Sequence, residues 1–189
     1  VLTDSIEVTV QPMPDAGNDS IADYCLLVSD SVQLSNYIST TQIGVWEHPT
    51  FIASGELNAQ TGALASGNLG NATYDFEYII PGAGACLSDT ALITLNTQLP
   101  PDAGGDSLLQ LCGMPGDQED LNIYLTTAET GLWTETSGII SNQFDSITGM
   151  LDVTGLDDVY TFDYQVDGLN ACTGEFDIAT IELTIEEQT

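Results

Sequence analysis

The chain has 189 residues and carries 29 aspartates and glutamates but no lysine or arginine, which gives a formal net charge of −29. Nucleic acids, anionic membranes and phosphate ligands are bound through cationic side chains, so this composition excludes them as partners. Hydrophobic residues make up 42% of the chain, which is typical of a folded protein with an acidic surface and not of a disordered acidic tail.

The carboxylates lack lysine or arginine partners, so they need cations from the solvent. Their mutual repulsion opposes compaction, and calcium, magnesium or concentrated salt reduces it. The sequence has no apolar run of the roughly 18 residues that span a bilayer. Because Val1 does not open a signal peptide, we expect an internal piece of a longer, exported precursor without membrane insertion.

The first predicted strand lies within residues 1–11, where Ile6, Val8 and Val10 alternate with polar residues. The same alternation closes each of the two longer segments that follow. We therefore interpret residues 1–11 as the last strand of a preceding repeat, residues 12–98 as one domain, and residues 99–189 as a second domain.

The two domains repeat one series of landmarks in the same order, at an offset of 86 or 87 residues. Such internal periodicity indicates a string of similar modules. The paired landmarks are Pro14-Asp15-Ala16-Gly17 with Pro101-Asp102-Ala103-Gly104, Cys25 with Cys112, Gly44-Val45-Trp46 with Gly131-Leu132-Trp133, Thr61-Gly62 with Thr148-Gly149, Tyr74-Asp75-Phe76-Glu77-Tyr78 with Tyr160-Thr161-Phe162-Asp163-Tyr164, and Cys86 with Cys172.

Alternation of apolar and polar residues dominates both domains and predicts half-buried strands, most clearly in residues 74–80 and 160–166. Gly, Asn, Asp and Ser clusters separate these segments, and none of them has a helical period. About seven short strands per domain are typical of an antiparallel, immunoglobulin-like β-sandwich. We expect Trp46 and Trp133 to pack in the two cores; a ligand platform is the alternative.

The cysteines also follow the repeat, with one pair in each domain. We predict the disulfides Cys25–Cys86 and Cys112–Cys172. Each closes a loop of about 60 residues, which stabilises a fold by on the order of 4 kcal/mol in the chain-entropy model. Disulfides imply an oxidising compartment. The alternatives are free buried thiols and a metal site, although CxxC spacing and histidines, which zinc would need, are missing.

Two aspartates stand at the start of each domain and suggest a calcium site. Asp15 and Asp19, and likewise Asp102 and Asp106, flank an Ala-Gly pair that permits a tight turn. Calcium takes six to eight hard oxygen ligands, and the alternative is a turn stabilised by Asx hydrogen bonds. Further ligands would come from Asp89, Asp117, Glu119, Asp120, Asp157, Asp158 and Asp177.

Aspartate followed by serine or threonine and then by a small or aliphatic residue occurs repeatedly. This triplet resembles the general O-glycosylation signal of the Bacteroidota; the alternative is that it marks strand starts. Asn18 and Asn71 also open N-glycosylation sequons, a weak pattern. The predicted O-glycosylation sites are Ser5, Ser20, Ser31, Thr90, Ser107 and Ser146.

Catalysis finds little support in the sequence, and we predict neither enzymatic activity nor an organic cofactor. His48 is the single histidine, and Glu135 takes its place in the second domain. The chain has no nucleophile elbow, metalloprotease helix motif or glycine-rich phosphate loop. Its carboxylates are so many that no acid and nucleophile pair stands out.

The series Pro-Asp-Ala-Gly-x-Asp, Cys, Gly-x-Trp, Tyr-x-Phe-x-Tyr, Cys resembles repeats in giant surface proteins of gliding and marine Bacteroidota. The best-known examples are gliding-motility adhesins secreted by the type IX system, and the repeats are also similar to polycystic-kidney-disease-type modules. The resemblance covers both domains. It implies an extracellular, cell-surface protein used for adhesion, with no catalytic residue to carry over. The absence of lysine and arginine departs from ordinary members.

These observations lead to one principal functional hypothesis and two alternatives. The principal one is a structural and adhesive segment of an extracellular filament, stiffened by disulfides and cations, glycosylated, and in contact with neighbouring repeats or self-assembled copies. A module that binds a surface glycan or protein is the second, for which the loop around Phe51 and Ile52 is the hint. An accessory domain of a secreted enzyme is the third.

Overall fold

The structure is a computed structural model that describes residues 4, 6–27, 31–48, 56–113, 116–127, 129–138 and 142–187. The chain divides into two compact units, Val1–Leu99 (unit 1) and Pro100–Thr189 (unit 2). Each unit has a hydrophobic core of its own.

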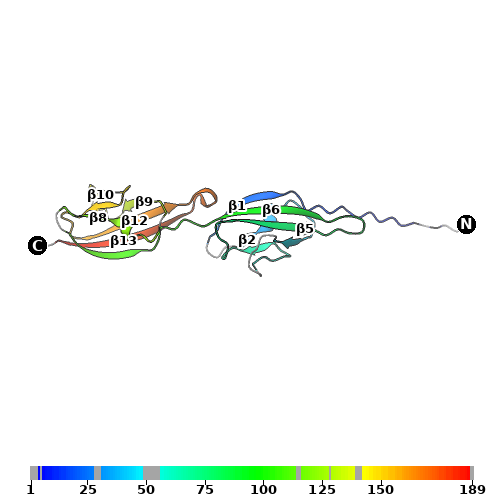
Figure 1. The fold of residues 1–189 in the computed structure, drawn as a ribbon, viewed down its shortest axis with the longest axis horizontal. Helices are drawn as coiled ribbons and strands as arrows, with labels where there is room; N and C mark the ends of the chain where they lie inside the picture. The colour runs from blue at the N-terminus through cyan, green and yellow to red at the C-terminus, as the bar shows by residue number, and fades with distance from the viewer. Residues whose placement is uncertain are drawn as a thin grey trace. The chain divides into compact units, whose positions relative to one another are not determined.

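Unit 1 is built from short strands in two sheets (Figure 1). The larger sheet has the strand order β1-β6-β5-β3, and the smaller sheet pairs β2 with β4. A 3₁₀ helix, η1, follows β2 directly. The elements are β1 (Ser20–Cys25), β2 (Ser31–Gln33), η1 (Leu34–Tyr37), β3 (Val45–Glu47), β4 (Ala63–Ala65), β5 (Thr73–Ile80) and β6 (Asp89–Gln98).

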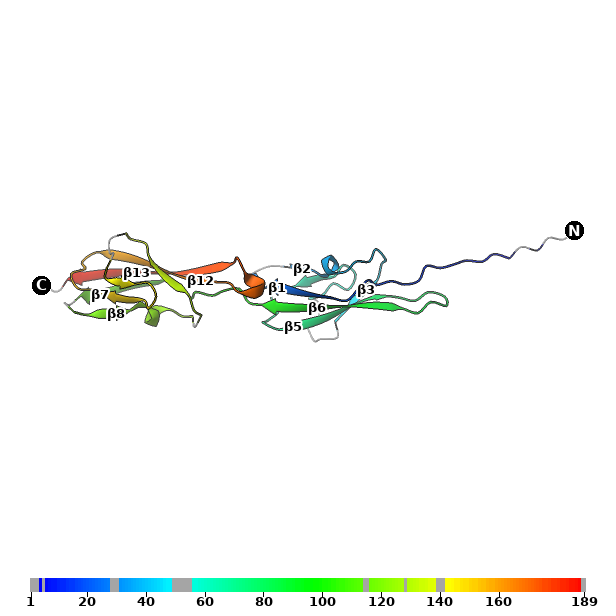
Figure 2. The same cartoon turned by 90° about the horizontal axis from the view of Figure 1, so that it is seen from above.

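Unit 2 repeats this plan, and Figure 2 shows β7, β12 and β13 of its larger sheet. The larger sheet has the order β7-β13-β12-β9, and the smaller sheet the order β10-β11-β8. The elements are β7 (Ser107–Gly113), β8 (Gln118–Asp120), η2 (Leu121–Tyr124), β9 (Leu132–Glu135), β10 (Phe144–Asp145), β11 (Met150–Asp152), β12 (Val159–Asp167), η3 (Asn170–Cys172) and β13 (Phe176–Glu187).

The alternation seen in the sequence places every second side chain of the long strands in the core. In unit 1, Phe76 on β5 and Ile93 and Leu95 on β6 are fully buried. Phe162 on β12 and Ile181 on β13 are their counterparts in unit 2. Each such side chain contributes about 1.5–3 kcal/mol through burial. The prediction of an all-β protein of two tandem immunoglobulin-like sandwiches is confirmed.

The first strand of each unit differs from the fully antiparallel expectation. β1 pairs with β6 in parallel, from Ser20 opposite Ile93 to Cys25 opposite Gln98. β7 pairs with β13 in parallel in the same way, whereas the other pairs within the named sheets are antiparallel. In each unit, therefore, the chain enters the first strand at one end of the large sheet and leaves the last strand at the opposite end.

The segment before β1 belongs to no strand in residues 6–19, and Figure 2 shows its first part as an extended trace. The side chains of Ile6, Val8 and Val10 are 78–89% exposed. They therefore add nothing to the core of unit 1. That residues 1–11 are the last strand of a preceding repeat remains a prediction.

Candidate functional site

The Pro-Asp-Ala-Gly motif of unit 1 forms a tight turn whose residue types are set by packing. Ala16 is fully buried, and Gly17 has a φ of +88°, which favours glycine. A Cβ at Gly17 would lie 3.0 Å from Ser39 Oγ. The Oδ1 of Asp15 accepts a 3.0 Å hydrogen bond from the Gly17 N–H, which is the Asx geometry named as the alternative to a metal site.

Unit 2 builds the same turn from the second copy of the motif. Ala103 is fully buried, Gly104 has a φ of +92°, and Asp102 Oδ1 accepts a 2.9 Å hydrogen bond from the Gly104 N–H. The motif therefore has a structural role in both units. Its aspartate closes the turn, its alanine fills the core and its glycine permits the backbone conformation.

Two further carboxylates join the first and last strands of unit 1. Asp89, at the start of β6, accepts a 2.8 Å hydrogen bond from the Ala16 N–H. In the opposite direction, Asp19, just before β1, accepts a 2.8 Å bond from the Leu92 N–H of β6. We call this reciprocal pair the carboxylate clamp. It extends the contact between the terminal strands beyond the first ladder pair.

Unit 2 has the same clamp in the same arrangement. Asp177 on β13 accepts a 2.8 Å hydrogen bond from the Ala103 N–H, and Asp106 accepts a 2.8 Å bond from the Thr180 N–H. Hydrogen bonds to charged acceptors contribute about 1.5–3 kcal/mol each. Our sequence reasoning named Asp89 and Asp177 only as supplementary ligands, although their recurrence at the start of the last strand was a usable signal.

The structure thus places the four predicted calcium ligands, Asp15, Asp19, Asp102 and Asp106, in hydrogen bonds to backbone N–H groups. Within the described ranges, no three His, Cys, Asp or Glu side chains form a group that could hold a metal ion. The turn alternative accounts for the observed contacts, and calcium binding remains a prediction.

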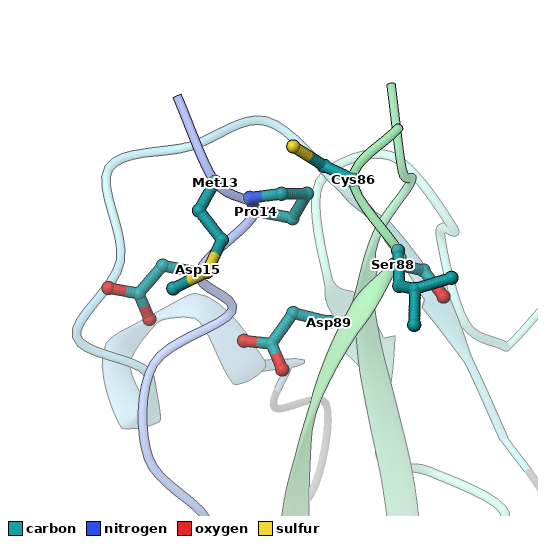
Figure 3. A pocket seen from close by; sticks show the side chains of 7 residues that line it. Met13, Pro14, Asp15, Cys86, Ser88 and Asp89 are labelled. Carbon is teal, nitrogen blue, oxygen red and sulfur yellow. The ribbon is translucent and has the colours of Figure 1, made fainter. Parts of the chain in front are cut away.

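A cleft of about 570 Å³ lies beside the clamp of unit 1. Figure 3 shows that one wall is the segment Met13–Asp15, and that Cys86 and Asp89 lie on the opposite wall, around the loop that joins β5 to β6. The lining combines apolar surface, two carboxylates and one thiol. Its lining contains no cationic side chain.

Most of the other acidic residues predicted as extra ligands also contact their own surroundings. Asp120 accepts a 3.0 Å bond from the Asn122 N–H, and Asp158 accepts a 2.8 Å bond from the Val159 N–H. Glu119 accepts a hydrogen bond from the Tyr124 hydroxyl. Burial, assisted by this bond and by the charge of Glu119, raises the pKa of Tyr124 to about 12.

The aromatic motif forms the centre of each core. Trp46 is 2% exposed and its ring lies 4.7 Å from that of Tyr78. A Cβ at Gly62 would lie 2.6 Å from Trp46 Nε1, so only glycine fits against the indole. The Tyr78 hydroxyl accepts a 2.6 Å bond from the Gly44 N–H and donates a 2.9 Å bond to the Gln42 carbonyl.

In unit 2, Trp133, Gly149 and Tyr164 are arranged in the same way, with ring centroids 4.9 Å apart. The Tyr164 hydroxyl accepts from the Gly131 N–H and donates to the Glu129 carbonyl. With Trp133 3% exposed, the prediction that both tryptophans pack in the cores is confirmed. The ligand-platform alternative is wrong.

The cysteines differ from the prediction. Cys25 and Cys172 are disulfide-bonded, whereas Cys86 and Cys112 are free thiols. The predicted pairs Cys25–Cys86 and Cys112–Cys172 are therefore wrong. The two cysteines of one unit lie near opposite ends of its terminal strands, because Cys25 is paired with Gln98 while Cys86 precedes Asp89.

The predicted O-glycosylation residues mostly lie at strand starts, in agreement with the alternative. Ser20, Ser31 and Ser107 open β1, β2 and β7, and Thr90 is the second residue of β6. Ser31, Thr90 and Ser146 are exposed. The Ser20 hydroxyl oxygen is buried without a hydrogen-bond partner, which disfavours a glycan there in the folded protein. Ser5 lies outside the described residues.

The alternative ligand-binding loop at Phe51 and Ile52 also lies outside the described residues. His48 is exposed at the end of β3. In the part of the chain that the structure covers, no helix is both long and apolar enough to cross a bilayer.

No family model and no curated protein matches this sequence. The structure is similar to extracellular domains 3–5 of Drosophila OTK, with a TM-score of 0.46 and 9% identity over 91% of this chain and 60% of that chain. This chain thus spans less than two thirds of the OTK structure.

Human protocadherin-24 EC1-2 is similar with a TM-score of 0.40 and 9% identity, over 89% of this chain and 95% of that chain. Immunoglobulin domains 1–4 of Sidekick-1 give a TM-score of 0.37 and 12% identity, over 90% of this chain and 47% of that chain. All three similarities concern the fold alone.

Proposed function

We propose that each unit is a mechanical spacer in an extracellular, adhesive surface protein. The observation that carries this proposal is the parallel pairing of the terminal strands in both units, through six residue pairs in unit 1 and seven in unit 2. Tension on the two ends of a unit pulls these strands along their length in opposite directions. The ladder hydrogen bonds are then loaded together in shear, and not one after another.

The carboxylate clamps support the same proposal. Asp19 and Asp89 connect the two strands that carry the load in unit 1, and Asp106 and Asp177 do so in unit 2. A side-chain bond of 3.0 Å from Asn96 Nδ2 to Asp23 adds to the contact in unit 1. The motif residues thus serve to hold the terminal strands together.

The wider identity follows from the resemblance of the repeats. The parent protein is a giant surface protein of the gliding-motility-adhesin type, exported by Bacteroidota, located at the cell surface and O-glycosylated at exposed triplets. Its partners are neighbouring repeats and, at other positions of the parent, a surface glycan or protein. The lack of lysine and arginine supports an exterior role, because trypsin-like proteases find no cleavage site.

Single-molecule pulling between the two termini of the full chain tests the spacer role. Under reducing conditions we expect two unfolding steps, each lengthening the chain by roughly 25–30 nm, because each unit releases about 80 residues at 3.3–3.6 Å per residue. Extension without resolvable steps would contradict the proposal.

The pulling direction provides the matched control. In the variant Cys112→Ser, a handle on Cys86 and a second handle on the N-terminus load β1 and β6 from the same end of the sheet. Their hydrogen bonds then open one at a time, so we expect unit 1 to unfold at a several-fold lower force. Equal forces in the two geometries would show that shear of the terminal strands is not the source of resistance.

Cations form the second part of the proposed function. The net charge of −29 without lysine or arginine supports it, because screening reduces the repulsion between carboxylates. We expect the melting temperature to rise from low to high NaCl. A larger rise in CaCl2 at matched ionic strength, lost in Asp15→Asn with Asp102→Asn, identifies specific calcium sites. Equal rises of the melting temperature in the two salts would mean that cations act through screening only. No rise in either salt would contradict a role for cations.

A further inference from the structure

The two cysteines of each unit lie at opposite poles of its large sheet. In unit 1, Cys25 ends β1 opposite Gln98, the last residue of β6. Cys86 lies in the loop just before Asp89, the first residue of β6. A ten-residue strand is roughly 30 Å long. Because a disulfide needs Cα atoms about 4.4–6.8 Å apart, these two cysteines cannot pair within the unit.

Unit 2 repeats this separation. Cys112 lies opposite Glu186, near the end of β13, and Cys172 ends η3, shortly before Phe176 opens β13. We call Cys25 and Cys112 the end-strand cysteines, and Cys86 and Cys172 the hairpin cysteines. No unit can therefore close its own disulfide, and each carries one cysteine of either kind.

The two hairpin cysteines have the same backbone setting. The Cys86 N–H donates a 3.1 Å bond to the Ala83 carbonyl, and the Cys172 N–H donates a 2.9 Å bond to the Leu169 carbonyl. Each loop has a glycine near its start, Gly82 or Gly168, where an added Cβ would lie only 2.4 or 2.2 Å from the carbonyl oxygen of the cysteine. A hairpin cysteine is thus presented in the same way whether it is bonded or free.

Each oxidation state includes one cysteine of either kind. The bonded set holds one end-strand cysteine, Cys25, and one hairpin cysteine, Cys172. The free set also holds one of each, Cys112 and Cys86. The two free thiols are therefore of the same two kinds as the two bonded cysteines, and they are available for a further disulfide.

We propose that Cys112 of one copy of this chain forms a disulfide with Cys86 of a second copy, so that copies join head to tail. A contact between two different surfaces of the same molecule links one copy to the next, and the series either closes into a ring or continues as an open chain. Cys112 is exposed, and Cys86 borders the cleft of unit 1 (Figure 3), where an incoming strand end has room. The link extends the spacer from one chain to many.

The chemistry is thiol–disulfide exchange with a low-molecular-weight disulfide as the oxidant. A thiolate of Cys112 attacks this disulfide, releases one small thiol and forms a mixed disulfide. The thiolate of Cys86 from the second copy then attacks the sulfur of Cys112 and releases the second small thiol. Two protein thiols are oxidised to one disulfide, and the oxidant takes up their two electrons and two protons.

Two single variants test the pairing without perturbing the bonded cysteines. Cys86→Ser keeps the thiol of Cys112, and Cys112→Ser keeps the thiol of Cys86. We label Cys86→Ser with nitrogen-15, mix it with unlabelled Cys112→Ser, and incubate the mixture in a glutathione redox buffer at high salt, where the repulsion between the polyanions is screened. Intact mass under non-reducing conditions separates the mixed dimer from both like-with-like dimers.

We expect the mixed dimer to exceed each like-with-like dimer by about tenfold, because only the Cys112–Cys86 pair joins complementary surfaces. The unmodified chain should give a ladder of longer species, and the double variant Cys86→Ser with Cys112→Ser should stay monomeric. A statistical mixture of the three dimers, or thiols that stay free in all samples, would overturn the proposal. Either result would leave the pulling test of the spacer role unaffected.

Discussion

The last strand of unit 1 contains a buried threonine where the last strand of unit 2 contains an isoleucine. Thr97 is 4% exposed, and its hydroxyl donates to the carbonyl oxygens of Gly70 and Ala72, at 2.6 and 2.9 Å. Ile185, at the same place in β13, is 1% exposed and packs in the apolar core. The position requires burial, and each unit meets that requirement with different chemistry.

A second difference lies in the turn that precedes β4 and β11. In unit 1, Asn58 Oδ1 accepts hydrogen bonds from the N–H groups of Gln60 and Thr61. In unit 2, Asp145 Oδ1 accepts from the N–H groups of Ile147 and Thr148. An amide oxygen in unit 1 and a carboxylate oxygen in unit 2 thus accept the same pair of backbone hydrogen bonds in this turn. The repeat preserves the acceptor and not the charge, which indicates that carboxylates at such turns have a structural use.

The largest effect should come from the tryptophan at each core. Trp46→Ala removes a buried ring and should lower the free energy of unfolding of unit 1 by about 3–5 kcal/mol. Trp133→Ala should cost more in unit 2, because Trp133 also contacts Phe144, 6.4 Å away, and donates to Asn122. Urea unfolding followed by circular dichroism, with fluorescence of the remaining tryptophan, measures both. Equal losses of unfolding free energy in the two units would show that the additional contacts of Trp133 do not contribute to the stability of unit 2.

The carboxylate clamp should give the next largest effect, and the same one in both units. Asp89→Ala and Asp177→Ala each remove the acceptor of a 2.8 Å bond, and each should destabilise its own unit by about 1.5–3 kcal/mol. Asp89→Asn keeps an acceptor oxygen and should restore most of the loss. Unit-specific urea unfolding measures these changes, and the pulling force of the corresponding step should fall with them. A stable Asp89→Ala variant with an unchanged unfolding force would refute the clamp.

The sequence predicted the parts of the fold that repeat as local patterns. Alternation located the buried faces of β5, β6, β12 and β13, and the paired motifs located both tryptophans. Alternation is the same in parallel and antiparallel pairs, so it did not reveal that β1 runs parallel to β6. Sequence spacing likewise does not tell which pole of a sheet a cysteine occupies, and the disulfide prediction was therefore wrong.

The aspartates show a different limit. An Asx turn, a bond to a neighbouring strand and a calcium site all use the same carboxylate oxygens. The pattern Asp15-Ala16-Gly17 is therefore compatible with each of them until the N–H partners are known. The partner of Asp19 lies on β6, 73 residues away in the sequence, and no local pattern identifies it.

Thr97→Val sharpens the comparison of the two last strands. The substitution keeps the shape but leaves the Gly70 carbonyl without its 2.6 Å donor, so unit 1 should lose about 1–3 kcal/mol. Ile185→Val is the control in unit 2, where only a methylene is lost at a cost of about 0.5–1.5 kcal/mol. Urea midpoints of the two units measure both. A neutral Thr97→Val would mean that the hydroxyl contributes only volume.

The smallest effect concerns pH and the turn at Asp145. Hydrogen bonds from the N–H of Ile147 and then from Thr148 hold the pKa of Asp145 below its usual value of 3.8. A lowered folded-state pKa contributes stability above the unfolded pKa, and this contribution disappears as pH falls through the folded value. Unit 2 should therefore lose stability in acid through this turn, whereas unit 1, with Asn58, should not.

Asp145→Asn converts the turn of unit 2 into that of unit 1 and should remove this part of the acid response while leaving stability near neutral pH unchanged. The measurement is the urea midpoint reported by Trp133 in a Trp46→Phe background, between about pH 5 and pH 2. A residual acid response should remain from Asp152, whose pKa is lowered by hydrogen bonds with Thr154. Asp152→Ala removes this carboxyl group and introduces the residue that unit 1 has at the equivalent position, Ala65. An acid response of unit 2 that persists undiminished in the double variant would show that these turns do not set it.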